Sequence, residues 1–269
     1  MVSRTRITVL LLLSSVVITG ASGWAQGAAG QEQVQAAVKN PPPAAVPMID
    51  QRALDVLKNM SDTIIQAKTM GFQSRSMIPI KGPNGIWINL FGVSRVMVQG
   101  QNKLFAETRG DFFPYDFYFD GTTVTAYAPT KNVYAQKEAP GTVEELTDRA
   151  YREEGRTFPY ADILTSNPYE KLTSGLTKAI FVGRSTIAGV KTDHLAFSNE
   201  GVEWQIWVAE DDHLPRLVSA RYLEDVSEPD YTIEFFNWKL NEPVPDANFV
   251  FQNTSNAAKV DFRKPDKTI

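Results

Sequence analysis

The sequence of 269 residues contains no cysteine and only two histidines, His194 and His213. The absence of cysteine excludes disulfides, thiolate metal ligands, cysteine nucleophiles and a lipid-modified N-terminal cysteine. Two histidines cannot supply a three-histidine metal site, and they leave few candidates for general-base catalysis. We therefore predict that the protein has no metal site and no cofactor.

Motifs of common catalytic and nucleotide-binding sites are also missing. The sequence has no G-x-S-x-G, no P-loop, no G-x-G-x-x-G and no H-E-x-x-H. His194 follows Asp193, and neighbouring residues of a strand point to opposite faces, so this pair is not expected to act as a dyad. His213 lies in the acidic string EDDHLP, which is more typical of a solvated hairpin tip. We predict that the protein is not an enzyme, with a hydrolase whose site lacks a motif as an alternative.

The sequence has no excess of positive charge: 27 Lys and Arg residues stand against 31 Asp and Glu residues, and the formal net charge at pH 7 is -4. A nucleic-acid-binding protein needs a basic surface that displaces counterions from phosphates, so no nucleic-acid partner is predicted. Long apolar runs are scarce too. The longest, residues 7–18, is too short to span a bilayer core of about 30 Å, and no transmembrane segment is predicted in the mature chain.

Residues 1–25 have the pattern of a secretory signal peptide. Arg4 and Arg6 provide the positive start, the apolar stretch follows, and Gly23 and Ala25 occupy the -3 and -1 positions of a plausible cleavage site. A membrane anchor is the alternative interpretation. Cleavage would remove two positive charges and change the net charge from -4 to -6. The predicted location of the mature chain is the periplasm.

Two further segments are predicted to lie outside the folded domain. Residues 26–47 consist largely of Ala, Gln, Gly and Pro without an aromatic residue, so they cannot bury enough apolar surface to offset the entropy of ordering. We interpret them as a flexible leader. Residues 263–269 form a C-terminal tail, which leaves a single domain over residues 48–262.

The folded part begins with one amphipathic helix. Asp50 is a favourable N-cap, and apolar residues then recur at helical spacing at Ala53, Leu57, Met60 and Ile64. Because Gly71 is the first residue that would end this pattern, we expect a helix of about 20 residues, roughly 30 Å long.

After the helix, the apolar pattern changes to the alternation of strands. Short polar turns such as Asp120-Gly121 separate the segments, which makes consecutive strands antiparallel. A helix from Thr142 to about Glu154 and two short helical pieces, residues 160–166 and 169–176, divide the strands into two series. The predicted strands are 94–98, 103–109, 113–119, 122–128 and 132–137, followed by 179–187, 191–198, 202–209, 216–224, 231–240 and 249–252.

This order predicts an α+β fold with roughly ten strands. A sheet of that size curls or closes, so we expect a curved antiparallel sheet that forms a half-open β-barrel. The long N-terminal helix and the short helices would cover its concave side. Few helices are available for so wide an aromatic face, and an apolar cavity could remain between the layers, with a completely filled core as the alternative. The expected lining residues are Leu57, Met60, Ile64, Phe117, Phe119, Val202, Trp204, Ile206, Val208 and Phe235.

Several strings of the second half carry a family resemblance. They are GVKTDHLAF at residues 189–197, EWQIWV at residues 203–208, Leu214-Pro-Arg216 and Phe249-Val-Phe251. Together with the opening helix and the Phe119-Asp-Gly121 turn, they resemble an uncharacterised family of predicted bacterial periplasmic proteins related to the outer-membrane lipoprotein carriers LolA and LolB. The resemblance implies a half-open antiparallel barrel with helices as a lid, and in the carriers a role in binding acyl chains and moving lipoproteins.

The functional hypothesis that follows is a periplasmic binding or carrier protein for a lipid, a lipoprotein acyl chain or another hydrophobic ligand. The alternative is a cell-envelope interaction module with a filled core, which docks a protein partner. A dry apolar cavity of several hundred Å³ would favour the first hypothesis over the second.

Overall fold

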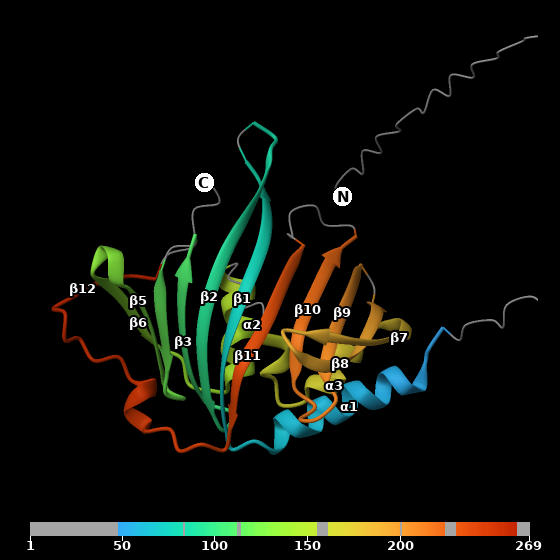
Figure 1. The fold of residues 1–269 in the computed structure, drawn as a ribbon. Helices are drawn as coiled ribbons and strands as arrows, with labels where there is room; N and C mark the ends of the chain where they lie inside the picture. The colour runs from blue at the N-terminus through green and yellow to red at the C-terminus, as the bar shows by residue number, and fades with distance from the viewer. Residues whose placement is uncertain are drawn as a thin grey trace, which may run out of the picture. The chain divides into compact units, whose positions relative to one another are not determined.

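Twelve strands form one sheet in the described part of this computed structural model, which comprises residues 48–82, 84–111, 114–154, 161–199, 201–223 and 230–262 (Figure 1). The predicted signal peptide, leader and C-terminal tail lie outside the described residues. The strands are β1 (Thr69–Lys81), β2 (Trp87–Gln99), β3 (Lys103–Gly110), β4 (Tyr115–Phe119), β5 (Thr123–Ala128), β6 (Val133–Glu138), β7 (Leu176–Ile187), β8 (Val190–Asn199), β9 (Val202–Ala209), β10 (Pro215–Tyr222), β11 (Tyr231–Leu240) and β12 (Ala258–Val260).

The strand order is β12-β6-β5-β4-β3-β2-β1-β11-β10-β9-β8-β7. All neighbours are antiparallel except β12 and β6, which run parallel. The first and last strands of this order are not paired with each other, so the sheet is open. The predicted α+β class with an open, mostly antiparallel sheet is confirmed.

The first helix, α1 (Gln51–Gln66), begins where the sequence predicts. The Asp50 carboxylate accepts a hydrogen bond from the backbone N–H of Arg52 at 2.9 Å, which satisfies one free donor of the first turn. The helix has 16 residues rather than the expected 20 or so. It ends early because the Lys68 N–H donates to the side chain of Asn241 and Thr69 already begins β1, so sheet pairing replaces the last predicted turn.

One face of the sheet, which we call the inner face, is covered by α1, α2 (Val143–Glu154) and α3 (Pro168–Thr173) (Figure 1). The register brings side chains of the same face opposite one another across four strands, because Phe72 pairs with Val96, Val96 with Ala106 and Ala106 with Phe117. All four are at most 5% exposed. The alternation of the strands therefore produces one continuous apolar core on this face.

Each helix covers a different part of this core. Helix α1 packs against β7, β8 and β9 at one side of the sheet. Leu146 of α2 lies beside Phe117 and Val124 of the opposite side. Helix α3 is joined to α1, because the backbone N–H of Tyr169 donates to the hydroxyl of the buried Ser61 at 3.0 Å.

The last predicted strand is wrong. Phe249 ends a 3-10 helix, η3 (Asp246–Phe249), rather than opening a strand over residues 249–252. Phe251 instead lies with its ring centroid 5.0 to 5.6 Å from the rings of Tyr118, Tyr127 and Tyr134 on the outer face of the sheet. Aromatic packing thus fixes this segment across the strands, and the chain then adds the unpredicted β12 beside β6.

Candidate functional site

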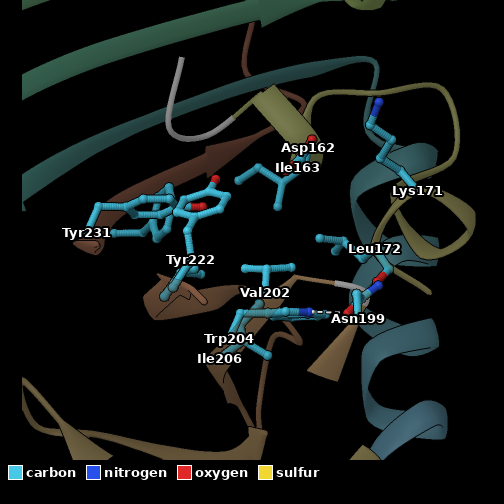
Figure 2. Close-up of a pocket in the computed structure, with 13 residues that line it drawn as sticks. Asp162, Ile163, Lys171, Leu172, Asn199, Val202, Trp204, Ile206, Tyr222 and Tyr231 are labelled. Carbon is cyan, nitrogen blue, oxygen red and sulfur yellow. Dashed lines mark hydrogen bonds between the residues drawn. The ribbon is translucent and has the colours of Figure 1, made fainter. Parts of the chain in front are cut away.

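A pocket with a volume of about 170 Å³ lies on the inner face, between the sheet and the segment that contains α3 (Figure 2). Strands β9, β10 and β11 form its floor, while α3 and the short helix η2 (Ala161–Ile163) stand over it. Its lining residues are Asp162, Ile163, Lys171, Leu172, Asn199, Val202, Trp204, Ile206, Val218, Ala220, Tyr222, Tyr231 and Phe235.

The floor of this inner pocket follows directly from strand register. Val202, Trp204 and Ile206 occupy alternate positions of β9, so they share one face. Their partners on β10 complete the apolar surface, since Val202 pairs with Tyr222, Trp204 with Ala220 and Ile206 with Val218. The small side chain of Ala220 at the centre of this surface leaves space above it.

Asn199 connects the floor of the pocket to α3. Its side-chain oxygen accepts a hydrogen bond from the Trp204 indole N–H at 2.7 Å, which Figure 2 shows as a dashed line. Its side-chain amide donates to the backbone carbonyls of Leu172 at 3.1 Å and Ser174 at 2.6 Å. The indole ring also stacks on Phe197 with a centroid distance of 4.3 Å. Trp204 is therefore held in one orientation as part of the pocket floor.

The mouth of the pocket carries its polar groups. Figure 2 shows Tyr222 and Tyr231 together at one side, with Asp162 and Lys171 on the segment above. Burial raises the pKa of Tyr231 far above its ordinary value, and the nearby Tyr222 and Asp162 raise it further. The Tyr231 phenol is therefore a neutral, amphipathic element of the pocket at physiological pH.

Neighbouring groups and burial have opposing effects on the pKa of the Asp162 carboxylate. Removal of water by the surrounding protein raises its pKa, Lys171 lowers it, and Asp148 raises it by a smaller amount. The Lys171 ammonium also forms an ion pair with Asp148 at 3.7 Å. The mouth therefore contains a carboxylate and an ammonium group on the segment that roofs the pocket, next to an apolar interior.

Four of the ten predicted lining residues come together in this pocket, namely Val202, Trp204, Ile206 and Phe235. Phe235 reaches it from β11, where its ring contacts Phe72 at a centroid distance of 5.6 Å. These four side chains are at most intermediate in exposure.

The other six predicted residues lie elsewhere in the core. Leu57 and Met60 of α1 are fully buried, and Ile64 lines a second pocket of about 120 Å³ beside the inner pocket. Phe117 and Phe119 belong to β4 at the opposite side of the sheet, where Phe117 lies beside α2. Val208 is 1% exposed near the end of β9, and it is paired with Pro215 beyond the pocket floor.

Sequence reasoning missed the roof and the mouth of the pocket. Ile163 lies on η2 and Leu172 on α3, within the two short helical pieces that the sequence places over the concave side but for which it predicts no lining residue. Val218, Ala220 and Tyr222 could have been found, because they alternate along a predicted strand. The remaining positions depend on how the helical segment lies over the sheet, which no local pattern specifies.

The two histidines lie outside the lining of the inner pocket. The His194 ring stacks on Trp207 with a centroid distance of 4.0 Å, and its Nε2 is 2.9 Å from the Gln205 side-chain oxygen. His213 occupies the turn after β9 with a φ of 56°, and its N–H donates to the carbonyl of Ala209. Among the described residues, no group of three or more His, Asp or Glu side chains could hold a metal ion.

No helix within the described ranges is long and apolar enough to cross a membrane.

Solved structures with similar folds include three of low sequence identity. An uncharacterized conserved protein from Thermus thermophilus is 10% identical over 79% of this chain and 100% of that chain, with a TM-score of 0.46. Lipoprotein LppX from Mycobacterium tuberculosis is 15% identical over 73% and 98%, with a TM-score of 0.40. A LolA superfamily protein from Nitrosomonas europaea is 12% identical over 74% and 97%, with a TM-score of 0.32.

A family match covers most of the chain. Residues 53–263 match the family described as predicted periplasmic protein (DUF2092). No curated protein sequence matches the chain. The matched range contains the helix, the sheet and the strings from which the resemblance was drawn, and the predicted location in the periplasm agrees with the family description. The chain therefore belongs to the family of predicted periplasmic proteins (DUF2092), and it is a periplasmic protein with an open, mostly antiparallel sheet.

Proposed function

We propose that the protein is a non-catalytic binding protein of the periplasm that holds the apolar part of a hydrophobic ligand in the inner pocket. The observation that carries the proposal is the pairing of an apolar floor with a polar mouth. Trp204, Ile206 and Phe235 would contact the apolar group of the ligand. Lys171 and the two tyrosines would contact a polar end. Such a combination of an apolar pocket with a few convergent polar groups is typical of small-molecule sites.

The volume limits what the pocket accepts. A cavity of about 150 Å³ in another protein holds a benzene molecule, so the 170 Å³ here suits a ring or a chain segment of about six carbons. At about 0.8 kcal/mol for each buried methylene group, six carbons give about 5 kcal/mol, which corresponds to a Kd of roughly 0.2 mM. Tighter binding requires the polar end of the ligand. We therefore favour an amphiphile, such as a lipid or an acylated molecule that inserts the end of one chain.

Binding of a series of fatty acids tests this proposal. We expect the affinity of the purified protein to rise with chain length up to about six to eight carbons and then to level off, because further carbons have no apolar wall to cover. Isothermal titration calorimetry measures each affinity, and Trp204 fluorescence reports contact with the floor.

A variant that fills the pocket provides the matched comparison. Ala220→Leu adds apolar atoms at the centre of the floor, and we expect it to weaken fatty-acid binding at least tenfold. Ala128→Leu makes the same change on β5, outside the pocket, and should leave the affinity unchanged. If neither short nor long chains bind, or if both variants bind as the wild type does, the pocket is not the binding site and the interaction module with a filled core becomes the better hypothesis.

A further inference from the structure

Strands β1 and β2 continue beyond the sheet as a two-stranded ribbon. Pairing of β1 with β11 ends at Met77, and pairing of β2 with β3 ends at Gly92. The two strands remain paired with each other as far as Lys81 opposite Trp87. Four residues beyond Met77 extend about 13 Å at 3.3 Å per residue. Figure 1 shows this ribbon, residues 78–82 and 84–91, projecting past the ends of the other strands.

The ribbon is apolar on both of its faces and at its tip. Ile78 and Ile80 lie opposite Leu90 and Ile88, which makes one face entirely aliphatic. The other face carries Pro79, Trp87 and Phe91 beside Asn89 and Lys81. Exposed fractions are 67% for Trp87, 66% for Ile86, 45% for Phe91 and 43% for Ile88. Monomeric soluble proteins rarely expose contiguous apolar surface of this kind unless it contacts a partner.

The arrangement of these residues favours a fluid apolar partner over a protein surface. A protein groove covers one face of a ribbon, whereas here both faces and the tip need cover. Addition of a strand from a second copy is also disfavoured, because Pro79 lacks an N–H and proline within a strand occupies the edge that faces outward. A lipid layer, by contrast, can surround the ribbon on all sides.

The backbone and the charge of the tip agree with a lipid partner. The Gly82 N–H donates to the Ile86 carbonyl at 2.8 Å, and the Gly85 N–H donates to the Gly82 carbonyl at 2.9 Å, so these donors do not depend on water. Lys81 is the only charged residue of the ribbon, on a chain with a net charge of -4. The tip of the ribbon thus carries a cation and no carboxylate beside an exposed tryptophan, which suits an anionic surface.

We propose that the ribbon inserts its tip into the interfacial layer of an anionic lipid surface and docks the protein there. The length of the ribbon fits a depth of about 5 to 10 Å, which is the usual position of interfacial apolar groups, and tryptophan is enriched at that depth. Lys81 lies opposite Trp87 and reaches the phosphate groups. This docking is independent of whether the inner pocket binds a ligand, because the ribbon and the pocket share no lining residue.

Vesicle flotation tests the docking. The full mature chain is mixed with vesicles of phosphatidylethanolamine and phosphatidylglycerol, and in parallel with vesicles of phosphatidylcholine alone. We expect binding to the anionic vesicles, and Ile86→Ser/Trp87→Ser should weaken it roughly tenfold or more, since two exposed side chains lose their apolar burial. Ile180→Ser/Val182→Ser changes two exposed apolar residues of β7, 40% and 51% exposed, and should bind as the wild type does. Lys81→Glu should weaken binding to anionic vesicles only.

Fluorescence quenching gives a second readout. Brominated lipids should quench Trp87 in the wild type, and Trp87→Phe should lose this quenching while it still binds vesicles. Circular dichroism establishes that each variant is folded. Ala220→Leu, which fills the pocket, should bind vesicles normally. The proposal is overturned if the wild type does not float with anionic vesicles or if Ile86→Ser/Trp87→Ser floats equally well. It is also overturned if those two substitutions abolish crosslinking to an envelope protein while vesicle binding is absent.

Discussion

Asn199 links α3 to the floor of the pocket, and its replacement tests this connection. The Asn199→Ala variant removes three hydrogen bonds at once, one from the Trp204 indole and two to the carbonyls of Leu172 and Ser174. The alanine side chain fits the same strand position. The variant therefore isolates the polar contacts without adding volume.

The expected loss in the free energy of unfolding follows from the number and burial of these hydrogen bonds. Each hydrogen bond contributes about 1 kcal/mol net, and an indole N–H that is left without a partner in a residue only 7% exposed adds a desolvation cost. We expect the free energy of unfolding to fall by about 3 to 4 kcal/mol. Asn199→Asp keeps the acceptor for Trp204 but should be at least as damaging at pH 7, because its carboxylate cannot donate and places a negative charge against the two carbonyl oxygens of Leu172 and Ser174.

Urea denaturation followed by circular dichroism measures these differences, and a double-mutant cycle separates the bond to Trp204. Trp204→Phe keeps a ring against Phe197 but removes the donor. If the bond acts as described, the coupling free energy between Asn199→Ala and Trp204→Phe is about 1 kcal/mol. A loss below about 0.5 kcal/mol for Asn199→Ala, within the range of ordinary surface substitutions, would refute the assigned role of this side chain.

Three further changes test other parts of the fold. The backbone N–H of Ser166 lowers the pKa of Glu144 below its ordinary value of 4.5 despite opposing desolvation. The Glu144 carboxylate therefore stabilises the fold above pH 4.5, and this contribution is lost as the pH falls through the folded pKa. In urea titrations, Glu144→Gln should cost about 1 kcal/mol at pH 7 and nothing once the pH is below the folded pKa. Ile163 lines both the inner pocket and the neighbouring 120 Å³ pocket. Ile163→Ala should lower the free energy of unfolding by about 2 to 4 kcal/mol and should join the two pockets, so that fatty-acid affinity levels off at longer chains. An unchanged plateau would show that the pockets do not join. Phe251→Ala should cost about 2 kcal/mol in thermal or urea unfolding, because the half-buried ring packs on three tyrosines, and a neutral result would contradict that packing.

Strands with one buried face and one solvent-exposed face were predictable from the sequence. β9 and β11 have the predicted bounds, since alternation of large apolar residues with polar ones identifies such strands. The turn at Asp120-Gly121 is also where the sequence places it, between β4 and β5. Gly121 takes the positive φ of 96°, whereas Asp120 does not, and the Asp120 carboxylate accepts N–H bonds from Thr122 and Thr123. The Asp120 side chain thus closes this hairpin together with the backbone bond from the Asp120 N–H to the Thr123 carbonyl.

The candidate site was predictable only in part. Val202 and Val208 share one face of β9 and are equivalent by pattern, yet only Val202 lines the inner pocket. The difference arises from Ile163 and Leu172, which stand above one end of the strand and not the other. Their position depends on long-range contacts such as those of Asn199 and Ser61, and an alternation pattern contains no information about them.

The ribbon shows a different reason why a pattern can fail. No element is predicted for residues 72–93, where apolar residues follow one another at positions 77–80 and 86–88 without the polar alternation of a half-buried strand. A continuous apolar run is typical of a strand buried on both faces. Such a strand packs between protein layers, whereas here the neighbours on both sides end at Met77 and Gly92, before the run is complete. Local sequence places apolar residues on both faces, but only the lengths of the neighbouring strands decide whether protein covers them. An apolar run that extends past its neighbouring strands is left uncovered by the described part of the chain, which is the physical basis for testing a lipid surface first.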